Sequence, residues 1–505
     1  MPGRIGMQML IAVLLAGGGR ASGPDDVAAL VARAESLRSQ QQFPAAIAVL
    51  QQAVALRPTD RQVALLLAET LGWDQHFRES ESVYRQILKR EPESREASIG
   101  LARTLLWQGH NAEARSLFQR LARRSPSDVD ASEGAATAAY WAGDWATAQR
   151  EFAAVLRRDA QRPSARKSLA EIEAATRGED SVSIEAIDDD QPFRTLHTEA
   201  VESFYSDPLT RWNVAAGGYA FRDRRRDRDW TAPSIRVSNR VAFPWQRLTI
   251  DSSIGMLRYG DGSTRALGGL AMHRTIGKGE IIASLDRHEL VATATARAFH
   301  PAIASWSLGW HRDRDPQRIL AVVDAGALRY NDHNRGWFAQ GYALIPVLHR
   351  DRVSVAVGGS LVARDTSESR FYVESVSSTR SADGPFFNYT YRGSYTPYWT
   401  PQRLRELRAI VKVSADLPRA ATLTLHADGG VAADVAQGFA PAAGPSPFPP
   451  AIATYDFDRH FHPWRASATL NVPFEDSLHL ELGFEQSTTA FYRARSIRAT
   501  LVRRR

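Results

Sequence analysis

The sequence predicts two structured parts, an N-terminal solenoid of paired helices and a C-terminal antiparallel transmembrane β-barrel of 16 strands. Residues 24–178 repeat with a period of 34, which is typical of stacked helix pairs. Residues 179–505 instead alternate apolar and polar residues in one segment after another, which indicates strands. A short apolar segment behind a basic residue occupies residues 1–23. We therefore expect a leader, a helical domain and a barrel with these three boundaries.

The first segment has the features of a secretory signal peptide. Arg4 precedes the apolar run Met9–Ala16, and small residues follow at 17–23. A basic start, a short hydrophobic stretch and small residues near a cleavage point are the features of such a peptide. The run is too short to span a bilayer as a helix. We expect the chain to be exported.

The helical part shows its 34-residue period at several independent positions. Small residues recur at one position, prolines at a second, tryptophans at a third and large residues at a fourth. They are Ala34, Ala68, Ala102 and Ala136; Pro58, Pro92 and Pro126; Trp73, Trp107 and Trp141; and Leu50, Tyr84, Phe118 and Phe152. Small residues let paired helices approach closely, and proline cannot continue a helix. Four repeats, capped by a helix at about Ser164–Thr176, resemble tetratricopeptide repeats.

The repeated tryptophans Trp73, Trp107 and Trp141 allow two interpretations. They pack between repeats, or they line a groove and stack on a sugar or a peptide. A solenoid of helix pairs offers an extended binding surface rather than a preorganised pair of catalytic groups. We expect this domain to bind and not to catalyse.

The hairpin Trp464–Val472 and Leu478–Glu485 shows the strand pattern most clearly. Apolar residues alternate strictly with polar ones in both segments, so each strand has one apolar and one polar face. In a soluble protein the apolar face would be the core, whereas in a membrane barrel it would face lipid. Aromatic residues near segment ends resemble the two girdles of a membrane barrel. They are Trp212, Trp245, Tyr259, Trp310, Tyr330, Trp464 and Phe474.

The connections between strands favour the membrane barrel. Short links such as Asp207–Thr210 and Leu417–Arg419 alternate with long ones such as Arg364–Thr400 and Asp434–His460. Outer-membrane barrels have tight periplasmic turns and long outer loops. Fifteen strands follow Leu196, and the segment Ser181–Ile187 brings the count to an even sixteen, with fourteen as the alternative count. A β-sandwich would need an interdomain linker and a propeller a blade repeat, and neither is evident.

Composition narrows the function without naming it. The chain has no cysteine and a net charge of +7, which excludes disulfides and thiolate catalysis but selects no partner. We find no nucleophile elbow, zinc-binding HExxH motif or P-loop. The histidine-containing groups and the acidic turn Asp188–Asp190 fit surface positions better than metal sites. We expect no enzyme activity, no cofactor, no metal and no nucleic-acid partner.

Short motifs add a resemblance to bacterial exopolysaccharide exporters. The repeat segments Leu71–Trp73, Leu105–Gly109 and Tyr140–Asp144 resemble the L-x-W-x-G pattern of their periplasmic arrays. The barrel segment Tyr398–Arg403, YWTPQR, resembles a stretch of the cellulose exporter barrel, with Thr400 in place of Ser. The similar families are the outer-membrane subunit of cellulose synthase, the poly-N-acetylglucosamine porin and the YaiO-like barrels. Surface-lipoprotein assembly modulators also join helical repeats to a barrel and are the alternative.

The resemblance implies an outer-membrane pore for a polysaccharide chain, with the repeats in the periplasm. The repeats would dock the polymer, an inner-membrane glycosyltransferase or synthase, or periplasmic proteins, and outer-membrane lipid would surround the barrel. Polar residues of alternating strands would line the pore and replace the hydration of a polymer without holding it tightly. We expect these to include His426, Asp428, Arg465, His479, Glu481 and Glu485. Their mixed charges favour a neutral or weakly charged polymer.

Overall fold

The computed structural model describes most of the chain, which divides into two compact units between Ile172 and Glu173. The described residues are 24–189, 193–223, 228–289, 302–312, 319–368, 372–380, 387–395, 400–437, 457–488 and 493–505. The expected signal peptide at 1–23 lies outside them, as does much of the longer connections. In the described part, no helix is both long and apolar enough to cross a membrane.

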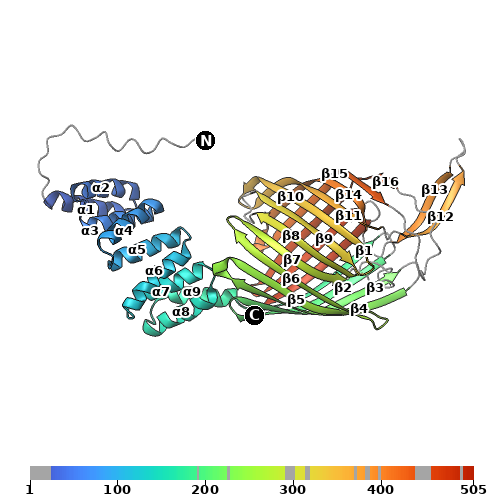
Figure 1. Cartoon of the computed structure of the whole chain (residues 1–505), viewed down its shortest axis with the longest axis horizontal. Coiled ribbons are helices and arrows are strands. Elements are labelled where there is room, and N and C mark those ends of the chain that lie inside the picture. The colour runs from blue at the N-terminus through green and yellow to red at the C-terminus, as the bar shows by residue number, and fades with distance from the viewer. Residues whose placement is uncertain are drawn as a thin grey trace. The chain divides into compact units, whose positions relative to one another are not determined.

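Nine helices form the N-terminal part of the described residues, and the boundary between the two units falls within the last of them (Figure 1). They are α1 (Pro24–Ser39), α2 (Phe43–Leu56), α3 (Arg61–Trp73), α4 (Phe77–Arg90), α5 (Arg95–Trp107), α6 (Asn111–Arg124), α7 (Val129–Trp141), α8 (Trp145–Arg158) and α9 (Pro163–Ala175). Helices α1 to α8 form four consecutive pairs, and α9 follows as a single cap. The predicted tetratricopeptide-type array, with its capping helix, is confirmed.

The 34-residue period fixes the helix ends. Asp60, Ser94 and Asp128 cap α3, α5 and α7, and each side chain accepts a hydrogen bond from a backbone N–H in the first turn. Two residues after the first helix of each pair, the backbone adopts a left-handed conformation, at positions that are again 34 apart: Gln41, Gln75, Gly109 and Gly143. The two glycines adopt this conformation without strain, whereas the two glutamines do not.

Large side chains pack against glycines of the following repeat. A Cβ atom built on Gly100 would lie 2.2 Å from the Tyr84 ring, and one on Gly134 would lie 2.3 Å from the Phe118 ring. These rings therefore occupy space that only glycine leaves free. Tyr84 and Phe118 are almost fully buried, and the sequence placed them at the same position of successive repeats.

Ion pairs join neighbouring repeats on the surface. Arg95 donates to both carboxylate oxygens of Asp128, at 2.6 and 2.8 Å, and to Asp130 at 2.9 Å. Arg162 also contacts Asp130 at 2.7 Å. The Arg95 guanidinium holds the pKa of Asp128 below its usual range, and Arg162 together with Arg95 does the same for the pKa of Asp130.

The second unit is a closed antiparallel barrel of 16 strands (Figure 1). They are β1 (Glu179–Asp189), β2 (Phe193–Asp207), β3 (Thr210–Asp223), β4 (Arg228–Phe243), β5 (Leu248–Arg258), β6 (Thr264–Ile276), β7 (Gly279–Glu289), β8 (Ala302–Arg312), β9 (Leu320–Tyr330), β10 (Arg335–Arg350), β11 (Val353–Thr366), β14 (Gln402–Asp416), β15 (Thr422–Gln437), β17 (Trp464–Glu475), β18 (Leu478–Thr488) and β19 (Arg493–Arg504). Each pairs with its neighbour in sequence order, and β1 pairs with β19 to close the ring. The predicted strand count is confirmed, including the strand at Ser181–Ile187.

Two smaller features complete the sheet. The short strand β16 (Phe457–His460) pairs with the end of β15 and continues the line of β17, so it adds no strand to the ring. Strands β12 (Tyr372–Arg380) and β13 (Phe387–Tyr395) form a separate two-stranded hairpin within the connection from β11 to β14. The hairpin does not pair with any barrel strand among the described residues.

The two ends of the barrel differ in their connections. At the end that we name the turn end, links are as short as Pro208–Leu209 between β2 and β3 or Asp476–Ser477 between β17 and β18. At the opposite end, named the loop end, the links between β11 and β14 and between β15 and β17 are the long ones. Strand β1 begins and strand β19 finishes at the turn end, where Glu179 pairs with Arg504. Tyr259–Ser263, a loop-end link, was not among the predicted connections.

Alternation divides the barrel wall into an apolar outer and a polar inner face. Large apolar residues at alternate positions, such as Ile254, Leu308 and Leu482, are exposed on the outside. The intervening positions carry polar residues that pair across strands, as described below. Because a closed ring satisfies its own backbone hydrogen bonds, this arrangement suits a bilayer.

The predicted aromatic girdles are partly wrong. Trp245, Trp310, Trp464 and Phe474 are exposed near strand ends, as a girdle requires. Tyr259 and Tyr330 are instead only 2% exposed and lie in buried clusters at the loop end. Strand alternation directs both side chains into the barrel. Their nearness to the ends of sequence segments, on which the prediction relied, does not show this direction.

Candidate functional site: the barrel lumen

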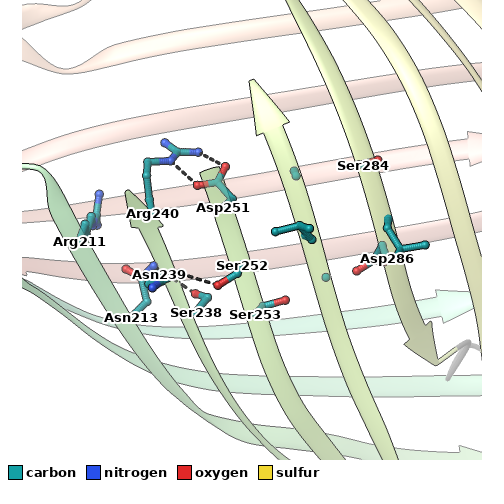
Figure 2. Close-up of a pocket in the computed structure, with 14 residues that line it drawn as sticks. Arg211, Asn213, Ser238, Asn239, Arg240, Asp251, Ser252, Ser253, Ser284 and Asp286 are labelled. Carbon is teal, nitrogen blue, oxygen red and sulfur yellow. Dashed lines mark hydrogen bonds and ion pairs between the residues drawn. The ribbon is translucent and has the colours of Figure 1, made fainter. Parts of the chain in front are cut away.

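A row of hydroxyl and amide groups crosses the inner face of β2, β3 and β4. The Ser203 hydroxyl donates to Asn213 Oδ1 at 2.7 Å, and Asn213 Nδ2 donates to Ser238 Oγ at 3.3 Å. Ser253 follows on β5 directly opposite Ser238. Further along the wall, the hydroxyls of Ser284 and Ser307 lie 2.6 Å apart. Figure 2 shows the central part of this surface, where short polar side chains line a cavity of about 560 Å³.

A charged group borders this row towards the turn end. Arg240 donates to both oxygens of Asp251, at 2.6 and 2.8 Å (Figure 2). His273 Nε2 lies 3.0 Å from the same carboxylate. Although all three groups face the lumen, the carboxylate already has two partners. This group therefore makes the lumen wall polar without adding a strong unpaired charge.

A second charged group lies on β14 and β15. Arg408 contacts Glu406 on its own strand and Asp428 on the next, the latter at 2.6 Å. His426 Nε2 lies 3.3 Å from the other oxygen of Asp428. Both carboxylates are nearly buried, so the arginine between them compensates two desolvated charges. These residues border a cavity of about 680 Å³ that also contacts β9, β10, β11 and β17.

Opposite charges also pair on the remaining wall. Arg498 contacts Glu481 at 2.7 Å, Arg465 contacts Glu485 at 3.1 Å and Arg236 contacts Glu199 at 2.9 Å. Each pair joins inward positions of nearby strands. Charges of both signs are thus distributed around the lumen and neutralise each other locally.

The predicted pore residues occupy inward positions in two groups. His426, Asp428 and Arg465 border the same cavity on β15 and β17. Glu481 and Glu485 each form an ion pair, with Arg498 and Arg465 respectively. His479 lies near the turn end of β18, opposite Val502, apart from the other five. Their part in polymer passage stays a prediction.

Sequence reasoning missed the partners that complete these groups. Arg408 and Glu406 belong to a segment, Gln402–Asp416, whose alternation was not used. The row Ser203, Asn213 and Ser238 is formed by cross-strand neighbours far apart in the chain. Alternation identifies the face of each residue, but only strand register shows which inward residues meet.

Buried apolar side chains lie on the inner face of the barrel near the loop end. Phe221, Leu257 and Tyr330 are directed inward and at most 3% exposed. The rings of His197, Tyr219, Phe221 and Trp230 stack in sequence, with centroids 4.4, 5.7 and 5.0 Å apart. We name the buried set Phe221, Trp230, Ala232, Leu257 and Tyr259 the loop-end cluster. Its burial contrasts with the half-exposed polar wall of the middle and turn end.

Each of the repeat tryptophans is partly exposed. Trp73, Trp107 and Trp141 are 45%, 40% and 47% exposed. Trp73 packs edge-on against Phe43 with centroids 5.8 Å apart, beneath the Arg38 guanidinium at 4.3 Å, and Trp107 packs on Phe77. One side of Trp73 and Trp107 therefore packs on the preceding repeat, while part of every indole remains accessible. Both interpretations of these tryptophans stay open.

Comparisons with known proteins match the two parts separately. Family models described as tetratricopeptide repeat match residues 74–133, 108–172 and 10–61. A search of curated proteins found no match. Tyr398 and Trp399, which carry part of the resemblance of the barrel, lie outside the described residues.

Three solved structures illustrate the likenesses. A "bacterial polysaccharide outer membrane secretin" has a TM-score of 0.47 and 10% identity, over 65% of this chain and 99% of that one. CdiB from Acinetobacter baumannii has a TM-score of 0.36 and 11% identity, over 65% of this chain and 60% of that one. A tetratricopeptide repeat protein from Parabacteroides merdae has a TM-score of 0.28 and 16% identity, over 30% and 59%. The chain joins tetratricopeptide repeats to a closed 16-stranded β-barrel.

Proposed function

We propose that the barrel is a passive conduit that exports an exopolysaccharide across the outer membrane. In this proposal the tetratricopeptide repeats lie in the periplasm and dock the polymer, its synthase or another periplasmic protein. No chemical step and no cofactor is part of the proposal. The chain would supply a wall along which a hydrated polymer moves.

The observation that carries the proposal is the chemistry of the lumen wall. Hydroxyl and amide groups such as those of Ser203, Asn213 and Ser238 can exchange hydrogen bonds with the hydroxyls of a sugar chain. Many of the charged lumen residues are paired, as Arg240 is with Asp251, so these pairs exert little net attraction on a passing charge. A conduit requires contacts that are favourable enough for entry and weak enough for exit.

Chain connectivity supports the proposed orientation. The helical unit leads into β1 at Glu179, and β1 begins at the turn end of the barrel. In outer-membrane barrels the tight turns face the periplasm and the long loops face outward. The same orientation puts the polar middle of the lumen next to the periplasm and the loop-end cluster at the outer mouth.

The alternative is a translocation or assembly factor for surface lipoproteins, and the barrel seam weighs against it. Such a function would benefit from a seam that opens sideways. Strands β1 and β19 instead pair without interruption from Glu179 with Arg504 to Asp189 with Ala494. Opening this seam would break a full strand-to-strand ladder, whose exposed groups lipid could not satisfy.

Planar-bilayer recording with the full-length protein tests the proposal. Neutral oligosaccharides added to one side should produce transient current blockades whose frequency rises with concentration. Strongly anionic oligosaccharides should block less, because the paired wall offers no excess positive charge. Ser238→Leu with Ser253→Leu should shorten the neutral-sugar blockades, while the outward Ile254→Leu should leave them unchanged. An open pore that no glycan blocks, or one that only unfolded polypeptide blocks, would overturn the proposal.

A further inference from the structure

Two arginines oppose each other on the outer face of the barrel near the loop end. Arg329 of β9 and Arg335 of β10 are direct cross-strand partners. Alternation places both on the same side as Val323 and Trp337, which are exposed to the membrane, and both arginines are exposed themselves. Opposed side chains on one face have Cβ atoms about 5 Å apart, and like charges at that position are destabilising.

The connection between the two strands holds this pair in place. The amide of Asn334 is fully buried and makes four hydrogen bonds in the link that joins β9 to β10. Its oxygen accepts from the Arg335 N–H, the Ser367 hydroxyl and the Glu368 N–H, and its nitrogen donates to the Glu368 carbonyl. The two arginines therefore oppose each other on a fixed backbone rather than on a loose loop.

Neither guanidinium has a carboxylate partner in the part of the chain that the structure describes. Arg405 of β14 is also exposed on the outer face near the loop end, and Asp434 of β15 is its direct cross-strand neighbour, although the two form no ion pair in the described structure. Elsewhere on this rim an outward arginine does have such a partner, since Arg194 contacts Asp188 at 2.8 Å. An anion between Arg329 and Arg335 would remove the repulsion that the fold imposes. Guanidinium groups bind phosphate in a bidentate manner, which makes phosphate a suitable anion.

An apolar groove begins next to these arginines. It has a volume of about 880 Å³, and its floor is made by short residues such as Ala339, Gly341 and Gly359. Leu361 and Leu407 flank the floor, and Arg405 borders the groove at its loop-end side. Trp337, 48% exposed, lies between the level of the Arg329–Arg335 pair and that of the groove. A tryptophan at this height is typical of the boundary between headgroups and acyl chains.

We propose that this surface binds lipopolysaccharide, with phosphate groups of the lipid on Arg329, Arg335 and Arg405 and an acyl chain in the groove. The inference goes beyond the proposed function, but it uses the orientation given there, which places the loop end in the outer leaflet. Charge complementarity selects an anionic lipid, and arginines at two positions suit a headgroup with more than one phosphate. The occupied groove would anchor the barrel next to the long loops.

The test measures binding of lipopolysaccharide to the full-length protein in detergent by native mass spectrometry. The double variant Arg329→Gln with Arg335→Gln should reduce affinity at least tenfold, and Ala339→Phe, which fills the groove, should do the same. Matched controls are Arg274→Gln with Arg503→Gln, outward arginines at the turn end, and Ala283→Phe on the outer face of β7. Both controls should bind as the parent does.

Three outcomes would overturn the inference. The first is equal binding by the arginine variant and the parent. The second is equal affinity for lipopolysaccharide and phosphatidylglycerol, which would assign the site to any anionic phospholipid. The third is a dimer that Ala339→Phe dissociates, which would make a second copy of the chain the occupant. Because binding in detergent needs neither transport nor a pore, this test can fail while the conduit proposal holds, and the reverse.

Discussion

Glu481 on β18 and Arg498 on β19 meet inside the barrel, with 2.7 Å between the carboxylate Oε1 and the guanidinium Nη2. The neighbouring residue on β18, Leu482, is directed to the opposite side, where 40% of its surface is exposed. Two adjacent positions of one strand therefore occupy environments of opposite polarity. This relationship, repeated around the ring, distinguishes a membrane barrel from a soluble sheet with an apolar core.

Substitution at these two adjacent positions tests the assignment of faces. Leu482→Arg should impair barrel assembly, because an arginine near the middle of the lipid-facing belt costs roughly 2–4 kcal/mol. Glu481→Gln should assemble normally, because Arg498 remains in contact with water and an exposed ion pair contributes only about 0–1 kcal/mol. Heat-modifiable mobility on gels reports folded barrel for both variants. Equal behaviour of the two would contradict the lipid-facing assignment of Leu482.

The helical unit should fold without the barrel. A fragment of residues 24–177 contains four helix pairs and α9, and each repeat contacts mainly its neighbours. Helix α9 covers the last pair through Ala165 and Ile172, which are fully buried. Circular dichroism should show a predominantly helical, soluble fragment with a cooperative thermal transition. A spectrum of coil or strand would contradict the independence of this unit.

The same fragment should lose stability in acid through one group of ion pairs. The pKa values of Asp128 and Asp130 are lowered in the folded state by Arg95 and Arg162, so their contribution is present above about pH 4. It disappears as the pH falls through the lower, folded-state values. Arg95→Met should therefore cost about 1 kcal/mol at pH 7 and reduce the drop in Tm between pH 6 and pH 3.

Lys167→Met is the matched control for the acid effect. Lys167 lies 3.9 Å from Glu171 and is largely exposed, so its loss should leave the pH profile unchanged. Thermal unfolding followed by circular dichroism across this pH range provides both profiles. Parallel profiles for the parent and Arg95→Met would show that the Arg95 pairs contribute nothing measurable.

The sequence predicts more of the fold than of the lumen site. The repeat period located the helix pairs because equivalent positions of successive repeats make the same packing contacts and therefore carry similar residues. The contacts of Tyr84 with Gly100 and of Phe118 with Gly134 are an example. Strand alternation located the 16 strands because a lipid-facing side must be apolar at every second residue. Both patterns are local and therefore readable from one chain.

The lumen depends on information that local patterns lack. Arg408 is 20 residues from Asp428, and Ser203 is ten from Asn213, yet each pair meets because neighbouring strands have a particular register. Tyr259 and Tyr330 were expected at the membrane boundary because they lie near segment ends, but their parity directs them inward. Counting alternate positions outward from the centre of each strand would have predicted the inward direction of these two side chains. It would not have shown that inward residues near the loop end pack into buried apolar clusters.

The long connection Arg364–Thr400 lies at the loop end and is a candidate gate for the outer mouth of the barrel. Ser367 and Glu368 bond to Asn334 and belong to the framework of the β9–β10 link, so they should be kept. Removal of Tyr372–Tyr395, the β12–β13 hairpin, should leave the barrel assembled, because the hairpin does not pair with the ring in the described structure. If this segment restricts the outer mouth, the deletion should raise single-channel conductance and antibiotic sensitivity.

The substitution Leu257→Ser, which alters the loop-end cluster, distinguishes a restriction by the hairpin from one by the cluster. A rise in conductance only with this substitution would assign the restriction to the cluster. Unchanged conductance in the hairpin deletion would exclude the hairpin as a gate.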